Sequence, residues 1–271
     1  MTALAVFRTG TLLRGRSTAA AVIVFCVATG LVTILGLGSF RQVGLGSVGP
    51  AAAALINLAL LLPTAQGLLV GAMTMTGDRE RGFGAMLRAR GVRPAVLVLT
   101  AWLAVALSSW LSIAAGFGVA AVIVAGNVPV DDLPAFSAIV GISLVAAAAA
   151  TAVGVLIGTL ASNRLQAMLA GLATWFALAI GFDLIVIGLG AFLRLGEGAI
   201  VFAIFADPLT AARVAALLVL DAGAGVLGPT GASLLGRLGH DGALVALLAV
   251  VVTWTIVPLV LAVQGILRRD G

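Results

Sequence analysis

A short charged run, Gly77–Arg93, holds most of the side chains in this chain that could do chemistry. It contains two of the ten acidic residues and five of the fifteen basic ones. Carboxylates close to guanidiniums form ion pairs, suit the ends of helices and bind complementary charges on another protein. We therefore treat this charged segment as the first candidate site, a surface for docking a soluble protein rather than a catalytic centre.

A second group of polar residues lies inside long apolar runs. Asp183 is the one acid well inside such a run, and a charge at the centre of a bilayer costs about 2.5–3.5 kcal/mol on insertion scales. That cost favours a role on a transport pathway; the alternatives are a position near the outer interface or a protonated, hydrogen-bonded carboxyl. Arg194 and Arg213 are its candidate partners. Asn57 and Gln66 would line a path or bond across helices.

Residues for catalysis or metal binding are missing from the sequence. Lysine is absent, which excludes a P-loop and Schiff-base chemistry. Neither Gly-x-Ser-x-Gly nor His-Glu-x-x-His occurs, and Cys26 and His240 lie too far apart for a ligand pair. Met73 and Met75, with Met86 nearby, would be either a path for a soft metal ion or ordinary apolar packing residues. We expect no cofactor, metal or nucleic acid on this chain, and ATP hydrolysis, if any, in another protein.

The composition places these residues in a membrane protein. Of 271 residues, 62% are hydrophobic and 9% are charged, whereas soluble domains carry roughly 25% charged residues. Six stretches reach the roughly 20 apolar residues of a transmembrane helix: Ser17–Gly38, Ala51–Thr76, Pro94–Ala125, Ser137–Ala161, Gln166–Phe192 and Ala243–Ile266. We predict an all-α integral membrane fold, a single transmembrane domain over residues 1–271 with six transmembrane helices.

Glycines inside the apolar runs predict two helix features. The third stretch is longer than a bilayer core, and Gly116 and Gly118 are its candidate bend points. The Gly67-x-x-x-Gly71 and Gly154-x-x-x-Gly158 motifs permit helices to approach closely. They would serve packing inside the bundle, with a dimer seam as the alternative.

The placement of arginine predicts the orientation in the membrane. Cytoplasmic loops carry an excess of Lys and Arg, and one set of loops here holds eleven arginines against four in the opposite set. We therefore expect a multi-pass protein of the cell membrane, with both termini and the charged segment in the cytoplasm. The first 16 residues predict a basic amphipathic helix on the cytoplasmic surface; a short disordered tail is the alternative.

Within the charged segment the sequence predicts a helix of two to three turns. Asp78 and Glu80 would begin it, where negative charge suits the helix dipole, and Gly91 would end it before Pro94. Apolar residues at i, i+3 and i+4 give it one apolar face, which a plain basic loop would not need. The predicted docking residues are Asp78, Arg79, Glu80, Arg81, Phe83, Met86, Leu87, Arg88 and Arg90.

Residues 194–242 form a long connection on the outer side. Asp207 and Pro208 are typical of an N-cap followed by proline at the first helical position, which predicts a helix to about Leu220. A second short helix is expected over Thr230–Leu238. Neither is long enough to span, so both would be re-entrant or interfacial helices or would pack against the bundle. Asp207, Pro208 and Arg213 are candidates for an external gate or partner contact.

The run Gly-Asp-Arg-Glu-Arg-Gly at 77–82, with Arg-Gly-Val-Arg-Pro at 90–94, resembles the ABC transporter type-2 permease family. In that family the matching segment is a coupling helix in a groove of a cytoplasmic ATPase subunit, and Glu80 matches one of its acidic positions. Residues 13–17 are similar to the family's interfacial helix and first-span entry. The resemblance implies a dimer of this chain with two ATPase subunits, which bind the ATP and Mg.

A narrower resemblance covers residues 175–213. Trp175-Phe176, the run 181–184 and the run 205–210 with Arg213 look like the membrane subunit of the transporter that matures the copper site of nitrous oxide reductase, although Asp207 replaces an Asn. It implies export of a copper or sulfur species, or coupling to an extracytoplasmic partner protein. The alternatives are export of a lipid, drug or other small molecule, a non-transporting scaffold that transmits ATPase motion, and an ATP-independent channel or carrier.

Overall fold

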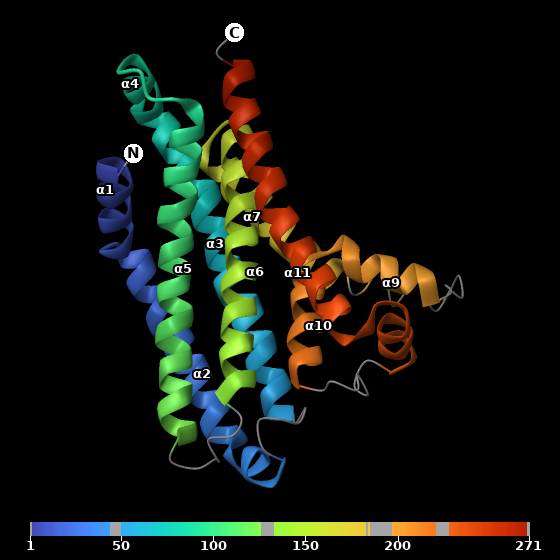
Figure 1. Ribbon diagram of the computed structural model, residues 1–271. Coiled ribbons are helices and arrows are strands. Elements are labelled where there is room, and N and C mark those ends of the chain that lie inside the picture. Colours follow the sequence, from blue (N-terminus) through green and yellow to red (C-terminus); the bar gives the residue numbers. More distant parts are fainter. Residues whose placement is uncertain are drawn as a thin grey trace.

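The computed structural model describes residues 2–43, 50–125, 133–182, 184, 197–220 and 228–269, which are helical over nearly their whole length. Six of these helices are long and apolar enough to cross a membrane, so the predicted all-helical fold with six helices of transmembrane length is confirmed. The helices are α1 (Thr2–Leu13), α2 (Arg16–Val43), α3 (Pro50–Glu80), α4 (Phe83–Ala89), α5 (Pro94–Ala125), α6 (Leu133–Leu160), α7 (Arg164–Phe176), η2 (Ala177–Gly181), α9 (Glu197–Ala206), α10 (Pro208–Leu220) and α11 (Gly228–Arg269), shown in Figure 1.

Helices α5 and α6 form the centre of the bundle. Within their most apolar stretches 61% and 72% of the residues are buried, against 17% in α7 and in α11. The outer helices therefore keep long apolar faces uncovered. A bilayer or another apolar protein surface is needed to cover such faces.

The closest packing joins α3 to α6. A Cβ atom added to Gly154 would lie 2.2 Å from the carbonyl oxygen of Leu68, and one on Gly158 would lie 2.3 Å from that of Ala72. The hydroxyl of Thr76 donates to the carbonyl of Gly158 at 3.1 Å. The Gly154 motif thus serves packing within the bundle, because only glycine lets the two backbones meet.

The long third span is one helix. Gly116 is buried, and a Cβ on it would lie 2.3 Å from the ring of Phe25, while the Thr29 hydroxyl donates to its carbonyl at 3.0 Å. Gly118 has open space around its Cα. Because α5 runs unbroken over 32 residues, neither glycine ends the helix, and Gly116 instead admits α2.

The fifth span begins as expected and then changes its winding. Helix α7 starts at Arg164 and passes into a π-helical segment, Ala177–Gly181. Such segments interrupt α-helical hydrogen bonding and are frequent at functional sites. The candidate Asp183 is two residues after Gly181 in the sequence and lies outside the described residues.

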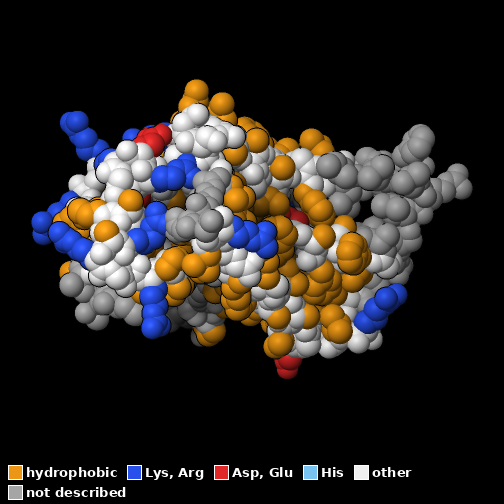
Figure 2. Space-filling model, turned by 90° about the horizontal axis from the view of Figure 1, so that it is seen from above, with side chains coloured by type: hydrophobic (Ala, Val, Ile, Leu, Met, Phe, Trp, Pro, Cys, Tyr) orange, Lys and Arg blue, Asp and Glu red, His pale blue; other side chains and the backbone are white. Residues whose placement is uncertain are grey.

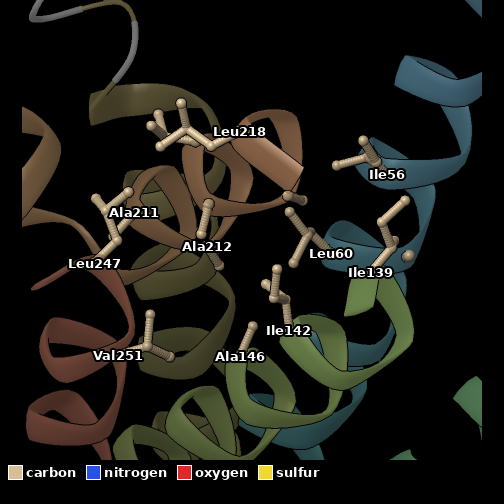
Figure 3. Packing of buried hydrophobic residues seen from close by; sticks show 14 of the residues in the cluster. Ile56, Leu60, Ile139, Ile142, Ala146, Ala211, Ala212, Leu218, Leu247 and Val251 are labelled. Atoms are coloured by element: carbon tan, nitrogen blue, oxygen red, sulfur yellow. The ribbon is translucent and has the colours of Figure 1, made fainter. Parts of the chain in front are cut away.

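The predicted outer helix lies inside the protein. Helix α10 starts at Pro208, as predicted, and its side chains are mostly buried against α6 and α11. Figure 3 shows Ala212 and Leu218 of α10 beside Leu60, Ile142 and Leu247 of three other helices. The label α11 covers two helices that meet at Gly239, whose φ of 68° and ψ of 173° are not helical. The short helix expected over Thr230–Leu238 and the sixth span are therefore separate helices, as predicted. Helix α9 was not predicted.

Both ends of the chain and α4 lie toward the same end of the bundle (Figure 1). The described helices that are long and apolar enough to cross a membrane number six, an even number, which agrees with the two ends lying together. Figure 2 views this end and shows arginine side chains distributed over its surface. The charged segment therefore lies among the arginines whose excess predicts the cytoplasmic side of the protein.

Candidate functional site

The charged segment contains the last turn of α3 and the short helix α4. The short helix was predicted to begin at Asp78, and this prediction is wrong. Helix α3 continues to Glu80, Gly82 adopts a left-handed conformation (φ 68°), and α4 begins at Phe83. The acids stay in α3 because its hydrogen bonding continues, with Arg81 N donating to Gly77 O at 3.2 Å. The predicted end is confirmed, since Gly91 has φ 79° and its N–H donates to Arg88 O at 2.8 Å.

Arg8 of α1 is buried against the charged segment. Its Nη2 donates to Asp78 Oδ2 at 2.6 Å, and its Nη1 donates to the carbonyl of Leu97 in α5 at 3.2 Å. Its guanidinium carbon lies 5.3 Å from the centre of the Phe83 ring in α4, a distance at which a cation is attracted to the ring face. One side chain thus joins α1 to α3, α4 and α5.

The surroundings of Arg8 act on its charge in two ways. Burial lowers the pKa of Arg8 below its ordinary value, and the Asp78 carboxylate opposes that change. Arg81 supplies a second, weaker partner to Asp78, with Nη2 3.3 Å from Oδ1 and a side chain that is 73% exposed. Sequence reasoning missed Arg8 because an arginine in a basic amphipathic helix is ordinarily solvated.

Arg79 caps the C-terminus of α6. Its Nη1 donates to Thr159 O at 3.1 Å, and its Nη2 donates to Ala161 O. Carbonyls at the end of a helix lack partners within the helix and carry partial negative charge, so a guanidinium there is favourable. The end of α3 is thereby fixed to the end of α6.

Glu80 caps the N-terminus of α7. Its Oε1 accepts a hydrogen bond from Arg164 N at 2.9 Å. The same helix start is closed by Asn163, whose Oδ1 accepts from Gln166 N at 2.8 Å, and by Gln166, whose Oε1 accepts from Ser162 N at 2.7 Å. Two consecutive residues of α3 therefore hold both sides of the α6–α7 turn.

Helix α4 itself is exposed. None of its residues is buried, and the Met86 side chain is 45% exposed. Phe83 and Met86 line a cavity of about 630 Å³ between α1, α3 and α4. Leu87 and Arg88 are half-buried, whereas Ala85, Ala89 and Arg90 are exposed. The charged segment therefore combines an exposed helix with an anchor of buried contacts.

The intramembrane candidates on α3 have different surroundings. Asn57 is exposed. Gln66 is half-buried beside an apolar cavity of about 200 Å³ between α2 and α3. Its Nε2 atom is buried and has no hydrogen-bond partner in the described part of the chain. Of the two, only Gln66 has such a buried polar atom without a partner, as expected of a residue that contacts another molecule or chain.

Asp207 and Pro208 form the start of α10, away from the charged segment. Asp207 is fully buried, and its Oδ2 accepts from Thr210 N at 2.7 Å and from Thr210 Oγ1 at 2.5 Å. Pro208 follows at the first helical position, and Arg213 lies half-buried one turn beyond Thr210. The N-cap predicted from the sequence is confirmed, and it stabilises a helix of the core.

The described residues contain no group of three or more His, Cys, Asp or Glu side chains that could hold a metal ion. The docking candidates at the end of α3 and on α4 are joined through Arg8 and the α6–α7 turn, whereas Asn57 and Gln66 on α3 and the candidates at α10 lie apart from them. No protein-family model matches the chain, and the search of curated proteins found no match.

Proposed function

We propose that the chain is the membrane-spanning permease subunit of an ATP-driven exporter of the cell membrane, with the α4 end in the cytoplasm. Six apolar helices and the bias of arginines support a multi-pass protein in this orientation. The chain has no lysine for a P-loop. A separate cytoplasmic ATPase that binds ATP and Mg therefore drives the transport.

The attachment of the charged segment carries this proposal. A coupling element needs an exposed surface for its partner and rigid connections to the helices that it moves. Helix α4 supplies the surface. Asp78, Arg79 and Glu80 supply the connections, to Arg8 in α1 and to the α6–α7 turn. A push on α4 would reach both sides of the bundle through these contacts.

The structure suggests how the predicted docking residues divide their work. The three residues at the end of α3 act inside the chain, and the exposed groups at 81–90 meet the ATPase. Met86 and Arg90 are the main contacts in this proposal, because interface anchors are commonly apolar or arginine side chains.

A second copy of this chain completes the transporter in this proposal. The apolar faces of α2, α7 and α11 remain uncovered in one copy, and lipid and the second copy would share them. Gln66, Asn57 and Asp183 would lie along the pathway, and α9 and α10 would form its outer gate or contact an extracytoplasmic partner. The resemblance of residues 175–213 makes a copper or sulfur species the first cargo to test, before lipids and drugs.

Affinity purification from the host membranes tests the docking. The wild-type chain should recover a P-loop ATPase in near-equal amount. The double variant Met86→Asp/Arg90→Glu should lose it, because a central contact worth about 2 kcal/mol weakens binding roughly thirtyfold. Both side chains are exposed, so packing is preserved, whereas a charge reversal at Glu80 would also remove the cap on α7.

Arg268→Glu is the matched control, since Arg268 is another exposed arginine at the same end of the bundle. It should leave the ATPase bound. Recovery of equal ATPase with the double variant would exclude docking through α4. Recovery of no ATPase with the wild-type chain would contradict the proposed function itself.

A further inference from the structure

We propose that the cavity between α1, α3 and α4 binds an anionic phospholipid of the cytoplasmic leaflet. The cavity measures about 630 Å³, within the range of small-molecule sites. The assignment to the cytoplasmic leaflet rests on the proposed function. The binding itself rests on the lining of the cavity and concerns this chain alone.

The charged lining favours an anion. Arg8, Arg81 and Arg164 line the cavity with a single acid, Asp78, so the described lining carries a net charge of about two positive. Arg8 and Asp78 neutralise each other through their 2.6 Å contact. Arg81 and Arg164 thus supply the excess charge.

The two remaining arginines are available to a ligand. The Arg81 side chain is 73% exposed; its Nη2 lies 3.3 Å from Asp78 Oδ1 and its Nε donates to Gly77 O at 3.1 Å, so its Nη1 faces no partner in the described part of the chain. Arg164 is exposed, and in the described part of the chain only its backbone N–H is hydrogen-bonded, to Glu80 Oε1, which leaves its guanidinium without a partner there. Guanidiniums bind phosphate oxygens in bidentate geometry, and basic pockets at the cytoplasmic ends of membrane helices bind anionic lipid headgroups.

Much of the rest of the lining is apolar, although Thr11, Ser17 and Thr74 also line the cavity. Val70 and Met73 of α3 line the cavity, and Val70 precedes Asp78 by eight residues, or about 12 Å along the helix. Phe7 and Leu12 of α1 and Met86 of α4 complete this part. A basic mouth above an apolar interior fits an amphiphile, whereas free phosphate would leave the apolar part unused.

Helix α1 places the cavity at the level of lipid headgroups. Its apolar side chains Val6 and Phe7 are 72% and 61% exposed, although Arg8 between α1 and the bundle is buried. A short helix with exposed apolar side chains beside a membrane bundle lies in the interface, its apolar side in lipid. Phe7 belongs both to this surface and to the cavity lining, so a lipid can enter from the leaflet.

Lipid binding to the purified chain in neutral detergent tests the inference. Delipidated protein is titrated with phosphatidylglycerol or phosphatidylcholine at equal mole fraction, or with inorganic phosphate, and bound lipid is measured by native mass spectrometry and thermal unfolding. Phosphatidylglycerol should bind and raise the unfolding temperature most. Arg81→Gln/Arg164→Gln should weaken its binding about thirtyfold, from two arginines beside one anionic headgroup.

Two further variants test the roles of charge and of cavity volume separately. Arg93→Gln/Arg268→Gln removes the same charge from residues outside the cavity lining and should bind phosphatidylglycerol normally. Met86→Trp fills the cavity from an exposed position and should reduce lipid binding without changing the response to phosphate. Equal binding of phosphatidylcholine, equal stabilisation by phosphate, or an unaffected Arg81/Arg164 variant would overturn the inference. Since the assay contains no ATPase, its failure is separate from failure of the proposed function.

Discussion

Replacing Asp78 by asparagine isolates the ion pair that joins α1 to the bundle. The side chains of Arg8 and Asp78 are 8% and 14% exposed and meet at 2.6 Å. Breaking a buried pair costs about 3–5 kcal/mol, because one charge is left without compensation. Arg8 keeps its bond to Leu97 O and its contact with Phe83. We therefore expect Asp78→Asn to lower the free energy of unfolding by about 3 kcal/mol, the lower end of that range.

Replacing the other partner, Arg8, should lower the free energy of unfolding by less. In Arg8→Met the carboxylate of Asp78 retains Arg81, 3.3 Å away and largely exposed. We expect a loss of about 2 kcal/mol. In the double variant the free energy of unfolding should fall by less than the sum of the two single losses, with a difference of at least about 1 kcal/mol. Residues that contact each other in one network are coupled in this way.

Reversible unfolding in mixed micelles with rising dodecyl sulfate, followed by tryptophan fluorescence and helicity, measures these differences. Arg14→Met is the control, since Arg14 is an exposed arginine close to Arg8 in the chain and should change the free energy by less than about 0.5 kcal/mol. An Asp78→Asn variant as stable as that control, or strictly additive single variants, would refute the assignment of Arg8 and Asp78 as a structural joint.

Four further changes test the packing and the caps, each in the same unfolding assay. Arg79→Gln should cost about 2 kcal/mol through lost charge-assisted bonds to the end of α6, and no loss would contradict the cap. Gly154→Ala should cost at least about 2 kcal/mol, since the new Cβ would lie 2.2 Å from Leu68 O. Gly118→Ala, with open space, should be neutral or stabilising by up to about 1 kcal/mol, and equal effects of the two would refute the α3–α6 seam. Asp207→Ala should cost about 1–2 kcal/mol as a lost N-cap, and an unchanged free energy would contradict it.

The long apolar runs and the local end signals were predictable from the sequence. Hydrophobic length alone locates the six spans. Gly91 and the Asp207-Pro208 pair mark helix ends because their backbone and side-chain preferences act within a few residues. For the short helix at 83–89 these signals locate the end at Gly91 but not the start at Phe83.

The contacts between distant segments were not predictable. Asp78 and Glu80 are acidic residues typical of a helix start, yet they lie at the end of α3. Their partners Arg8 and Arg164 are 70 and 84 residues away in the sequence. No periodicity in the sequence records such pairs. The burial of α10 in the protein core could not be predicted either. An apolar helix that is too short to span a membrane fits a membrane surface as well as a protein core.

Site-specific photo-cross-linking in the host membranes tests the central claim most directly. A photoreactive amino acid is placed at Met86 or Ala89 on the exposed side of α4, or at Leu99, an exposed apolar residue of α5. The account predicts that the two α4 positions cross-link to a P-loop ATPase and that position 99 does not. Absence of an ATPase adduct from both α4 positions, or an equal adduct from position 99, would contradict it.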